Sequence, residues 1–178
     1  MTKWRKDRGK LILVLGGAAS GKSQAALDLA GHKGPRAFVA TGQALDREMK
    51  VRIEQHQATR SRDWVTAEIP TDIAKWCTKN GKTYQTIVID CLTLWLSNLQ
   101  RLRRSDIAVS DTTSDMLHAI RTTGARVVIV SNELGLGLVP VTKGVRAFRD
   151  LAGRVNQQVA AEADEVYLTV SGIPMRVK

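Results

Sequence analysis

Residues 11–23 read Leu-Ile-Leu-Val-Leu-Gly-Gly-Ala-Ala-Ser-Gly-Lys-Ser, an apolar run that leads directly into a glycine-rich loop. From Gly16 to Ser23 the loop matches the GxxxxGK[ST] pattern in full, after a strand-like run and before a helical one, as the pattern requires. Its small residues let backbone N–H groups face a nucleotide β-phosphate, and the following helix adds the positive end of its dipole. Lys22 is expected to reach the β- and γ-phosphates, and Ser23 to bind Mg²⁺. The stretch therefore predicts a P-loop nucleotide site.

The rest of the chain alternates short β-branched runs with longer segments of helical period, the pattern of an α/β domain. The runs 87–89 and 127–130 do not alternate with polar residues, which is typical of parallel strands buried on both faces. We therefore predict a P-loop NTPase whose mostly parallel sheet is covered by helices on both faces. Strands are predicted at 11–15, 36–41, 64–69, 86–90, 126–131 and 165–170, and helices at 23–31, 46–60, 92–104, 113–123 and 145–163. Residues 105–114, rich in Asp, Ser and Thr, are predicted to form a mobile loop, and 173–174 a turn into a short edge strand.

Length and composition favour one domain of ordinary globular type. The chain has 178 residues, of which 43% are hydrophobic and 25% charged, and its net charge of +10 suits anionic ligands. Residues 1–10 form a basic tail that is expected to be flexible, and 11–178 a single domain. The first apolar run has five residues, too few for a signal peptide or a membrane span, so a cytoplasmic protein is expected. The two cysteines lack metal-site spacing and are expected to be idle thiols.

Asp90 is the candidate carboxylate for the metal. It ends the apolar run 87–89 and is therefore expected at the carboxyl edge of the sheet, where the P-loop also lies. An aspartate that ends a strand is also a common turn or helix cap, so the pattern alone leaves both roles open. Together with the P-loop, the position favours Ser23 and Asp90 as ligands of Mg²⁺.

His56 is the candidate nucleophile. Arg52, His56 and Arg60 share one face of the predicted helix, with Met49 and Ile53 alongside for the core. Two permanent cations disfavour the imidazolium form, so His56 is expected to be neutral and nucleophilic while the arginines hold a polyphosphate. The alternative is a surface helix that carries a titrating histidine.

These residues belong to a longer series of blocks, and with them the chain resembles the bifunctional adenosylcobinamide kinase/adenosylcobinamide-phosphate guanylyltransferase family of cobalamin biosynthesis. The resemblance runs from Leu11 to Lys178 and includes the loop GGAASGKS at 16–23. Its other blocks lie at 40–43, 46–49, 52–56, 64–68, 89–99, 131–135, 148–157, 163–164 and 170–174. So many separate blocks in the right order make the resemblance more specific than the P-loop alone.

The resemblance implies a RecA-like P-loop enzyme that phosphorylates adenosylcobinamide with ATP or GTP and then transfers GMP from GTP onto adenosylcobinamide phosphate. It implies that His56 carries GMP covalently and that the protein is a trimer. The P-loop itself makes Lys22 the expected catalytic lysine and, with the end of the run 87–89, makes Ser23 and Asp90 the expected Mg²⁺ ligands. The nucleotide contacts that the resemblance implies are Gly16, Gly17, Ala18, Ala19, Ser20, Gly21, Lys22, Ser23, Thr41, Gly42, Gln43, Gln57, Ala58, Thr59, Arg60, Glu68 and Asp90.

Two other functions are compatible with part of the pattern. A P-loop ATPase that acts on nucleic acid would explain the +10 charge and the basic tail. Against it, aromatic residues make up only 4% of the chain and no known nucleic-acid module is present, so we expect no nucleic-acid partner. A plain small-molecule or nucleoside kinase would use the P-loop but would leave His56 without a role.

Overall fold

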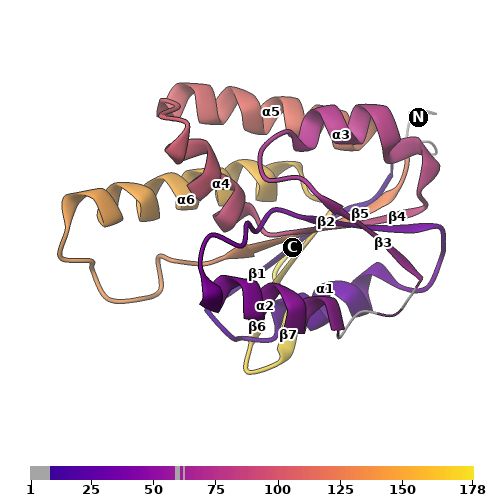
Figure 1. The fold of residues 1–178 in the computed structure, drawn as a ribbon, viewed down its shortest axis with the longest axis horizontal. Coiled ribbons are helices and arrows are strands. Elements are labelled where there is room, and N and C mark those ends of the chain that lie inside the picture. The colour runs from indigo at the N-terminus through magenta and orange to yellow at the C-terminus, as the bar shows by residue number, and fades with distance from the viewer. Residues whose placement is uncertain (1–8, 59–60, 62) are drawn as a thin grey trace.

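The fold is a single seven-stranded sheet with helices on both sides (Figure 1). In this computed structural model the described residues are 9–58, 61 and 63–178. The strands are β1 (Leu11–Gly16), β2 (Arg36–Ala40), β3 (Trp64–Glu68), β4 (Thr86–Asp90), β5 (Arg126–Asn132), β6 (Glu165–Val170) and β7 (Ile173–Arg176). The helices are α1 (Lys22–Ala30), α2 (Arg47–Ala58), α3 (Ile73–Asn80), α4 (Leu92–Arg101), α5 (Asp106–Thr122) and α6 (Lys143–Glu162), with a 3₁₀ turn η2 at Gly81–Thr83.

The strand order is β3-β2-β4-β5-β1-β6-β7, and every pairing is parallel except that of β6 with β7. Successive side chains of each strand enter opposite layers, so Leu11 and Leu13 join one buried cluster and Ile12 and Val14 the other. The first cluster packs under α3, α4, α5 and α6, and the second under α1, which lies with α2 on the other side of the sheet (Figure 1). The α/β architecture with a sheet covered on both faces is confirmed.

The six predicted strands are all present, and each bound lies within one residue of its prediction. The predicted short edge strand is present as β7, but the predicted turn at 173–174 is wrong, because these two residues begin the strand and the turn lies at 171–172. Parallel strands buried on both faces produce continuous apolar runs, which is why local sequence sufficed here. Helix α3 was not predicted, although the spacing of Ile73, Trp76 and Cys77 is that of one helical face, packed on the core.

The predicted mobile loop at 105–114 is wrong, because these residues form the first half of α5. The Ser105 hydroxyl accepts a hydrogen bond from the backbone N–H of Ala108 and so caps the helix N-terminus. The hydroxyls of Thr113 and Ser114 donate to carbonyls four residues earlier, which satisfies them inside the helix. Val109 is fully buried against the core, so tertiary packing overrides the polar composition.

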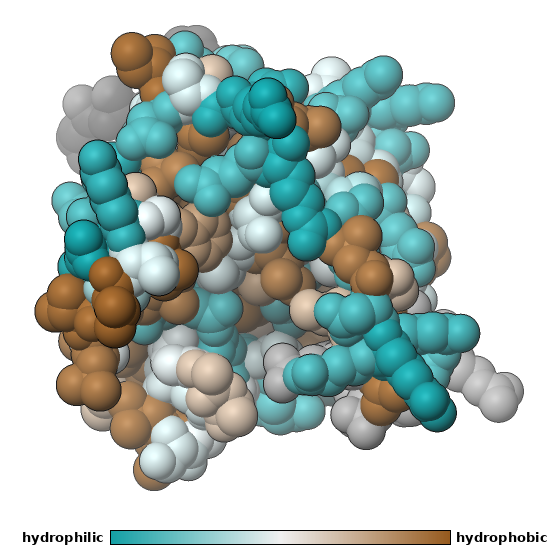
Figure 2. All heavy atoms as spheres, turned by 60° about the vertical axis from the view of Figure 1, so that its left-hand side comes forward, coloured by the Kyte–Doolittle hydropathy of each residue, from teal (hydrophilic) through white to brown (hydrophobic). Residues whose placement is uncertain are grey.

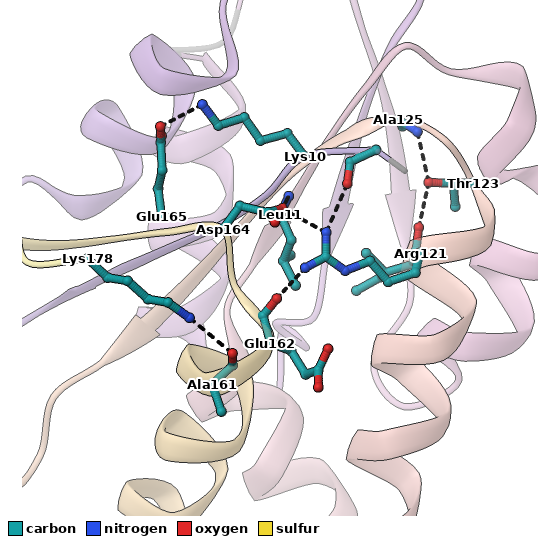
Figure 3. A network of polar contacts seen from close by, with 12 residues as sticks. Lys10, Leu11, Arg121, Thr123, Ala125, Ala161, Glu162, Asp164, Glu165 and Lys178 are labelled. Atoms are coloured by element: carbon teal, nitrogen blue, oxygen red, sulfur yellow. Dashed lines mark hydrogen bonds and ion pairs between the residues drawn. The ribbon is translucent and has the colours of Figure 1, made fainter. Parts of the chain in front are cut away.

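Polar contacts hold residues 9 and 10 and Lys178 at the amino-terminal edge of the sheet (Figure 3). Lys10 Nζ donates to Glu165 Oε1 at 2.6 Å, and Arg121 Nη1 donates to the carbonyl of Gly9 and to Asp164 Oδ2. Residues 9 and 10 of the predicted flexible tail are therefore packed against β6 and α5, whereas 1–8 lie outside the described residues. Within the described part of the chain, no helix has the length and apolar character to cross a membrane.

Both cysteines are free and buried, as expected for idle thiols. Burial raises the pKa of the Cys77 thiol to about 12 and that of Cys91 to about 11, with the Asp90 carboxylate adding to the second shift. A thiol that stays protonated near neutral pH is a poor nucleophile, so neither cysteine is a candidate for covalent catalysis.

Candidate active site

The glycine-rich loop joins β1 to α1 at the carboxyl edge of the sheet. A methyl group on Gly16 would lie 2.5 Å from both Ser20 Oγ and the carbonyl oxygen of Thr169, so no larger residue fits there. Gly21 precedes α1 with φ at +91°, a left-handed conformation that glycine adopts without strain. The turn between β6 and β7 fixes the loop from one side, because Gly172 N–H donates to the Ser20 carbonyl at 2.8 Å.

Lys22 begins α1 and is 8% exposed. Its ammonium group donates to the Gly17 carbonyl, which folds the side chain back across the loop. Burial lowers the pKa of Lys22 from its usual value, and the nearby Asp90 carboxylate opposes that shift. A largely desolvated cation at the start of a helix that follows a glycine-rich loop is suited to bind a polyphosphate.

Ser23 and Asp90 meet at the end of β4, where the serine hydroxyl donates to Asp90 Oδ2 at 2.7 Å. The strand order places β4 two strands from β1, so the loop and the aspartate share one edge, as the sequence predicted. A hydroxyl and a carboxylate are oxygen donors of the kind that Mg²⁺ prefers, and so the pair fits this ion. The described residues contain no cluster of three or more His, Cys, Asp and Glu, so most other ligands would be phosphate oxygens and water.

A cleft of about 660 Å³ opens from this pair toward α2 and α4. Of the nucleotide contacts expected from the resemblance, it contains the loop from Ala18 to Ser23, Gly42 and Asp90. The loop residues Gly16 and Gly17, together with Gln43 and Glu68, are not among the lining residues, and Glu68 lies exposed at the end of the edge strand β3. Sequence reasoning did not identify the remaining wall, which consists of Gln24, Leu27, Phe38, Ala40, Met49, Ile53, Cys91, Leu94 and Asn132.

Thr41 does not face this cleft. It is fully buried, and its hydroxyl donates to the Cys91 carbonyl at 2.7 Å while accepting from the Cys91 N–H at 2.8 Å. The Thr41 N–H donates to the Asp90 carbonyl, and Asn98 Nδ2 donates to the Thr41 carbonyl. Thr41 therefore joins the ends of β2 and β4 beneath Asp90, and the structure gives it a positioning role.

The helix that carries the candidate nucleophile lies beside the cleft. Met49 and Ile53 of α2, which the sequence placed in the core, line the cleft half-buried. His56 lies in the same helix, but its side chain falls outside the described part of the structure, as do those of Arg52, Gln57 and Ala58. Thr59 and Arg60 lie outside the described residues altogether.

A second cavity, of about 730 Å³, lies at the opposite edge of the sheet. Its lining includes Lys10, Arg121, Asp164 and Lys178, which are part of the network in Figure 3. These charged groups bind one another or backbone carbonyls, as when Lys178 Nζ donates to the carbonyls of Ala160 and Ala161. The contacts join Lys10 to the start of β6 and Lys178 to the end of α6, and the P-loop lies at the other edge.

Two solved structures with low sequence identity share the fold. Protein P4 of bacteriophage phi6, determined in complex with ADP, matches 97% of this chain and 56% of its own with a TM-score of 0.50 and 15% identity. A KaiC-like protein of Pyrococcus horikoshii OT3 matches 90% of this chain and 71% of its own, with a TM-score of 0.52 and 12% identity. Both support the assignment as a RecA-like P-loop NTPase fold.

Sequence comparison gives a narrower result. The bifunctional adenosylcobalamin biosynthesis proteins CobU of Salmonella typhimurium and Escherichia coli are 38% and 37% identical over 180 residues, covering 94% of this chain and 99% of theirs. CobP of Pseudomonas aeruginosa is 39% identical over 173 residues, covering 93% of this chain and 96% of its own. Residues 12–177 match the family model described as cobinamide kinase/cobinamide phosphate guanyltransferase. The chain is therefore a member of the cobinamide kinase/cobinamide phosphate guanyltransferase family.

Proposed function

We propose that the protein phosphorylates adenosylcobinamide and then transfers GMP from GTP to the resulting phosphate, giving adenosylcobinamide-GDP in cobalamin biosynthesis. The observation that carries the proposal is the contact of Ser23 with Asp90 beside buried Lys22, on a complete P-loop, in a member of this family. ATP or GTP is the phosphate donor in the first reaction, and GTP the guanylyl donor in the second.

In the first reaction the loop N–H groups and Lys22 hold the phosphates of the donor. The acceptor hydroxyl oxygen forms a bond to the γ-phosphorus, the bond to the β-phosphate oxygen breaks, a nucleoside diphosphate leaves, and the hydroxyl proton passes to water. Ser23 and Asp90 would hold Mg²⁺, which neutralises developing charge on the β- and γ-phosphates when it is bound. Lys22 contributes through charge and position, because phosphoryl transfer needs little else from the protein.

In the second reaction His56 is the guanylyl carrier. A ring nitrogen of neutral His56 forms a bond to the α-phosphorus of GTP, and the bond to the β-phosphate oxygen breaks to release pyrophosphate. An oxygen of adenosylcobinamide phosphate then attacks the same phosphorus and releases the histidine. Helix α2 supports this role, because residue 56 follows Ile53 by three positions and Met49 by seven, the spacing of one helix face, and both of those residues line the cleft.

Labelling with GTP carrying ³²P in the α-phosphate tests the carrier. Protein incubated with this GTP and Mg²⁺ should retain label on a denaturing gel, lose it in acid and keep it in alkali, as expected of a phosphorus–nitrogen bond. His56→Ala should take up no label yet should still phosphorylate adenosylcobinamide. His118→Ala is the matched control, because His118 is exposed on α5 outside the cleft. Wild-type labelling of a folded His56→Ala protein would exclude His56 as the carrier.

We also propose that the protein is a homotrimer in the cytoplasm without a nucleic-acid partner. The segment between β5 and α6 supports self-association, because Leu138 is 97% and Val141 94% exposed, and Leu136 and Val139 are also exposed. Hydrophobic side chains gather on one side of the face in Figure 2. Apolar exposure of this extent is typical of an interface. Analytical ultracentrifugation should give three times the 19.5 kDa chain mass, and Leu138→Asp should lower it.

A further inference from the structure

Asn132 lines the cleft, and none of the proposed steps uses it. It ends β5, the strand that lies between β1, which leads into the P-loop, and β4, which ends at Asp90. Val128 and Val130 of the same strand belong to the cluster under α1. Because side chains alternate along a strand, Asn132 points to that same side of the sheet, where it lines the cleft.

The backbone of Asn132 is fixed from the opposite side of the sheet. β4 ends at Asp90, which pairs with Val130, so Asn132 extends two residues past its neighbouring strand. Its N–H donates to Thr93 Oγ1 of α4 at 3.0 Å, and its carbonyl accepts from Asn156 Nδ2 of α6 at 3.1 Å. Both helices lie across the sheet from α1 (Figure 1). Two side chains from two helices therefore hold the backbone of one residue and leave its carboxamide free.

The carboxamide of Asn132 is available to a ligand. The other polar side chains at this place, Lys22, Ser23 and Gln24, each donate a hydrogen bond within the protein. The hydroxyl of Ser20 has no partner, but it is buried. Half-buried Asn132 makes no side-chain hydrogen bond to any described residue. A carboxamide N–H is a neutral donor, so it can bind a phosphate oxygen without adding a charge.

We propose that Asn132 donates a hydrogen bond to the phosphate chain of the nucleotide, and that Asn156 and Thr93 are positioning residues that hold it in place. The inference rests on the proposed function, which puts a nucleoside triphosphate on the P-loop. Asn132 pairs in register with Gly16, the first residue of that loop, and the next N–H donates to the Gly16 carbonyl at 3.0 Å. Its place beside the loop therefore holds for either orientation of the nucleoside.

Binding of a non-hydrolysable GTP analogue with Mg²⁺, measured by calorimetry, tests the contact. Asn132→Ala should weaken binding about 10- to 100-fold, the effect of losing a hydrogen bond to a charged group. Asn132→Asp should weaken it further, because a carboxylate repels the polyphosphate and donates no hydrogen bond. Asn80→Ala is the matched control and should leave the affinity unchanged, because Asn80 is also half-buried but lies at the end of α3, outside the cleft.

A double-mutant cycle with the same assay tests the positioning role. Asn156→Leu removes the donor to the Asn132 carbonyl, and Thr93→Val removes the acceptor of its N–H. Each should weaken binding severalfold in the wild-type background and should have no further effect in Asn132→Ala. Thr93→Ser keeps the hydroxyl and should bind like the wild type. The Thr93 variants keep the test valid if Asn156→Leu is unstable.

Two results would overturn the assignment. A folded Asn132→Ala protein that binds the analogue as tightly as the wild type would exclude the contact. Equal losses for Asn156→Leu and Thr93→Val in both backgrounds would show that they act on the fold and not through Asn132. These measurements need no acceptor, so a wild-type protein that binds the analogue but does not phosphorylate cobinamide would refute the proposed function alone.

Discussion

Replacing Thr41 with valine should destabilise the protein more than its small chemical change suggests. The Cys91 N–H donates to the Thr41 hydroxyl at 2.8 Å, and the same hydroxyl donates to the Cys91 carbonyl at 2.7 Å. Valine keeps the shape of threonine but removes both bonds. The Cys91 carbonyl keeps the helical bond from the Trp95 N–H, whereas the buried Cys91 N–H loses the hydroxyl that accepts its hydrogen bond.

The size of the effect follows from these two losses. A buried donor left without its partner costs about 1–3 kcal/mol, and loss of an ordinary hydrogen bond about 0.5–1.5 kcal/mol. We therefore expect Thr41→Val to lower the free energy of unfolding by about 1.5–4.5 kcal/mol. In a protein of this size 1 kcal/mol corresponds to about 2–4 °C, so Tm should fall by roughly 3–18 °C.

Urea denaturation of three variants measures this effect. Thr41→Ser keeps the hydroxyl and should remain clearly more stable than Thr41→Val. Thr113→Val is the matched control, because Thr113 is also fully buried but its hydroxyl donates only to the Val109 carbonyl of its own helix. Its loss should be at most about 1 kcal/mol. Equal stability of the two valine variants would refute the reasoning, and weaker nucleotide binding without loss of stability would indicate a direct nucleotide contact at Thr41.

Three further variants test the charged groups. Lys22→Ala should lower turnover in both half-reactions by about 100-fold or more, and near-normal turnover of a folded variant would contradict its role. Asp90→Asn should raise the Mg²⁺ concentration needed for activity. The Asp90 carboxylate also raises the pKa of Lys22, so without it Lys22 should lose its proton, and nucleotide binding should be lost, at a lower pH than in the wild type. Titration of nucleotide binding against pH measures this shift. Glu165→Gln should lower stability at neutral pH, because the hydrogen bond from Lys10 stabilises the Glu165 carboxylate and lowers its pKa. In urea unfolding, the difference between wild type and variant should shrink as the pH falls through this lowered pKa, below 4.5. A difference that does not change with pH would contradict this role of the carboxylate.

The parts of the fold and the site that the sequence predicted are those encoded locally. The central strands β1, β4 and β5 could be recognised because they contain continuous apolar runs, and the P-loop because its glycines, Lys22 and Ser23 are contiguous. Asp90 could be inferred because it ends such a run, and its contact with Ser23 over 67 positions confirms that the two lie together. Their role as metal ligands remains a prediction.

The remaining parts depend on contacts between distant segments. The role of Thr41 depends on Cys91, which is 50 residues further along the chain. Met49 and Leu94 lie in two separate blocks of the resemblance, 46–49 and 89–99, but nothing in either block indicates that the two side chains line one cleft; the packing of α2 and α4 around the end of β2 brings them together. Residues 105–114 were mispredicted for a related reason, because a serine cap and buried Val109 decide their conformation more than their polarity does.

The order of the strands suggests how one edge can serve two reactions. From the P-loop the edge runs through β5 to Asp90 on β4, then to β2 with Gly42 just beyond its end, and finally to Glu68 on β3. With about 4.8 Å between neighbouring strands, Asp90 lies roughly 10 Å from the end of β1, and Glu68 about 10 Å further along. Glu68 is thus too far away to bind the phosphates held by Lys22. A ligand group in contact with Glu68 would therefore lie beyond Asp90, so the two ends of this edge can be changed by separate residues.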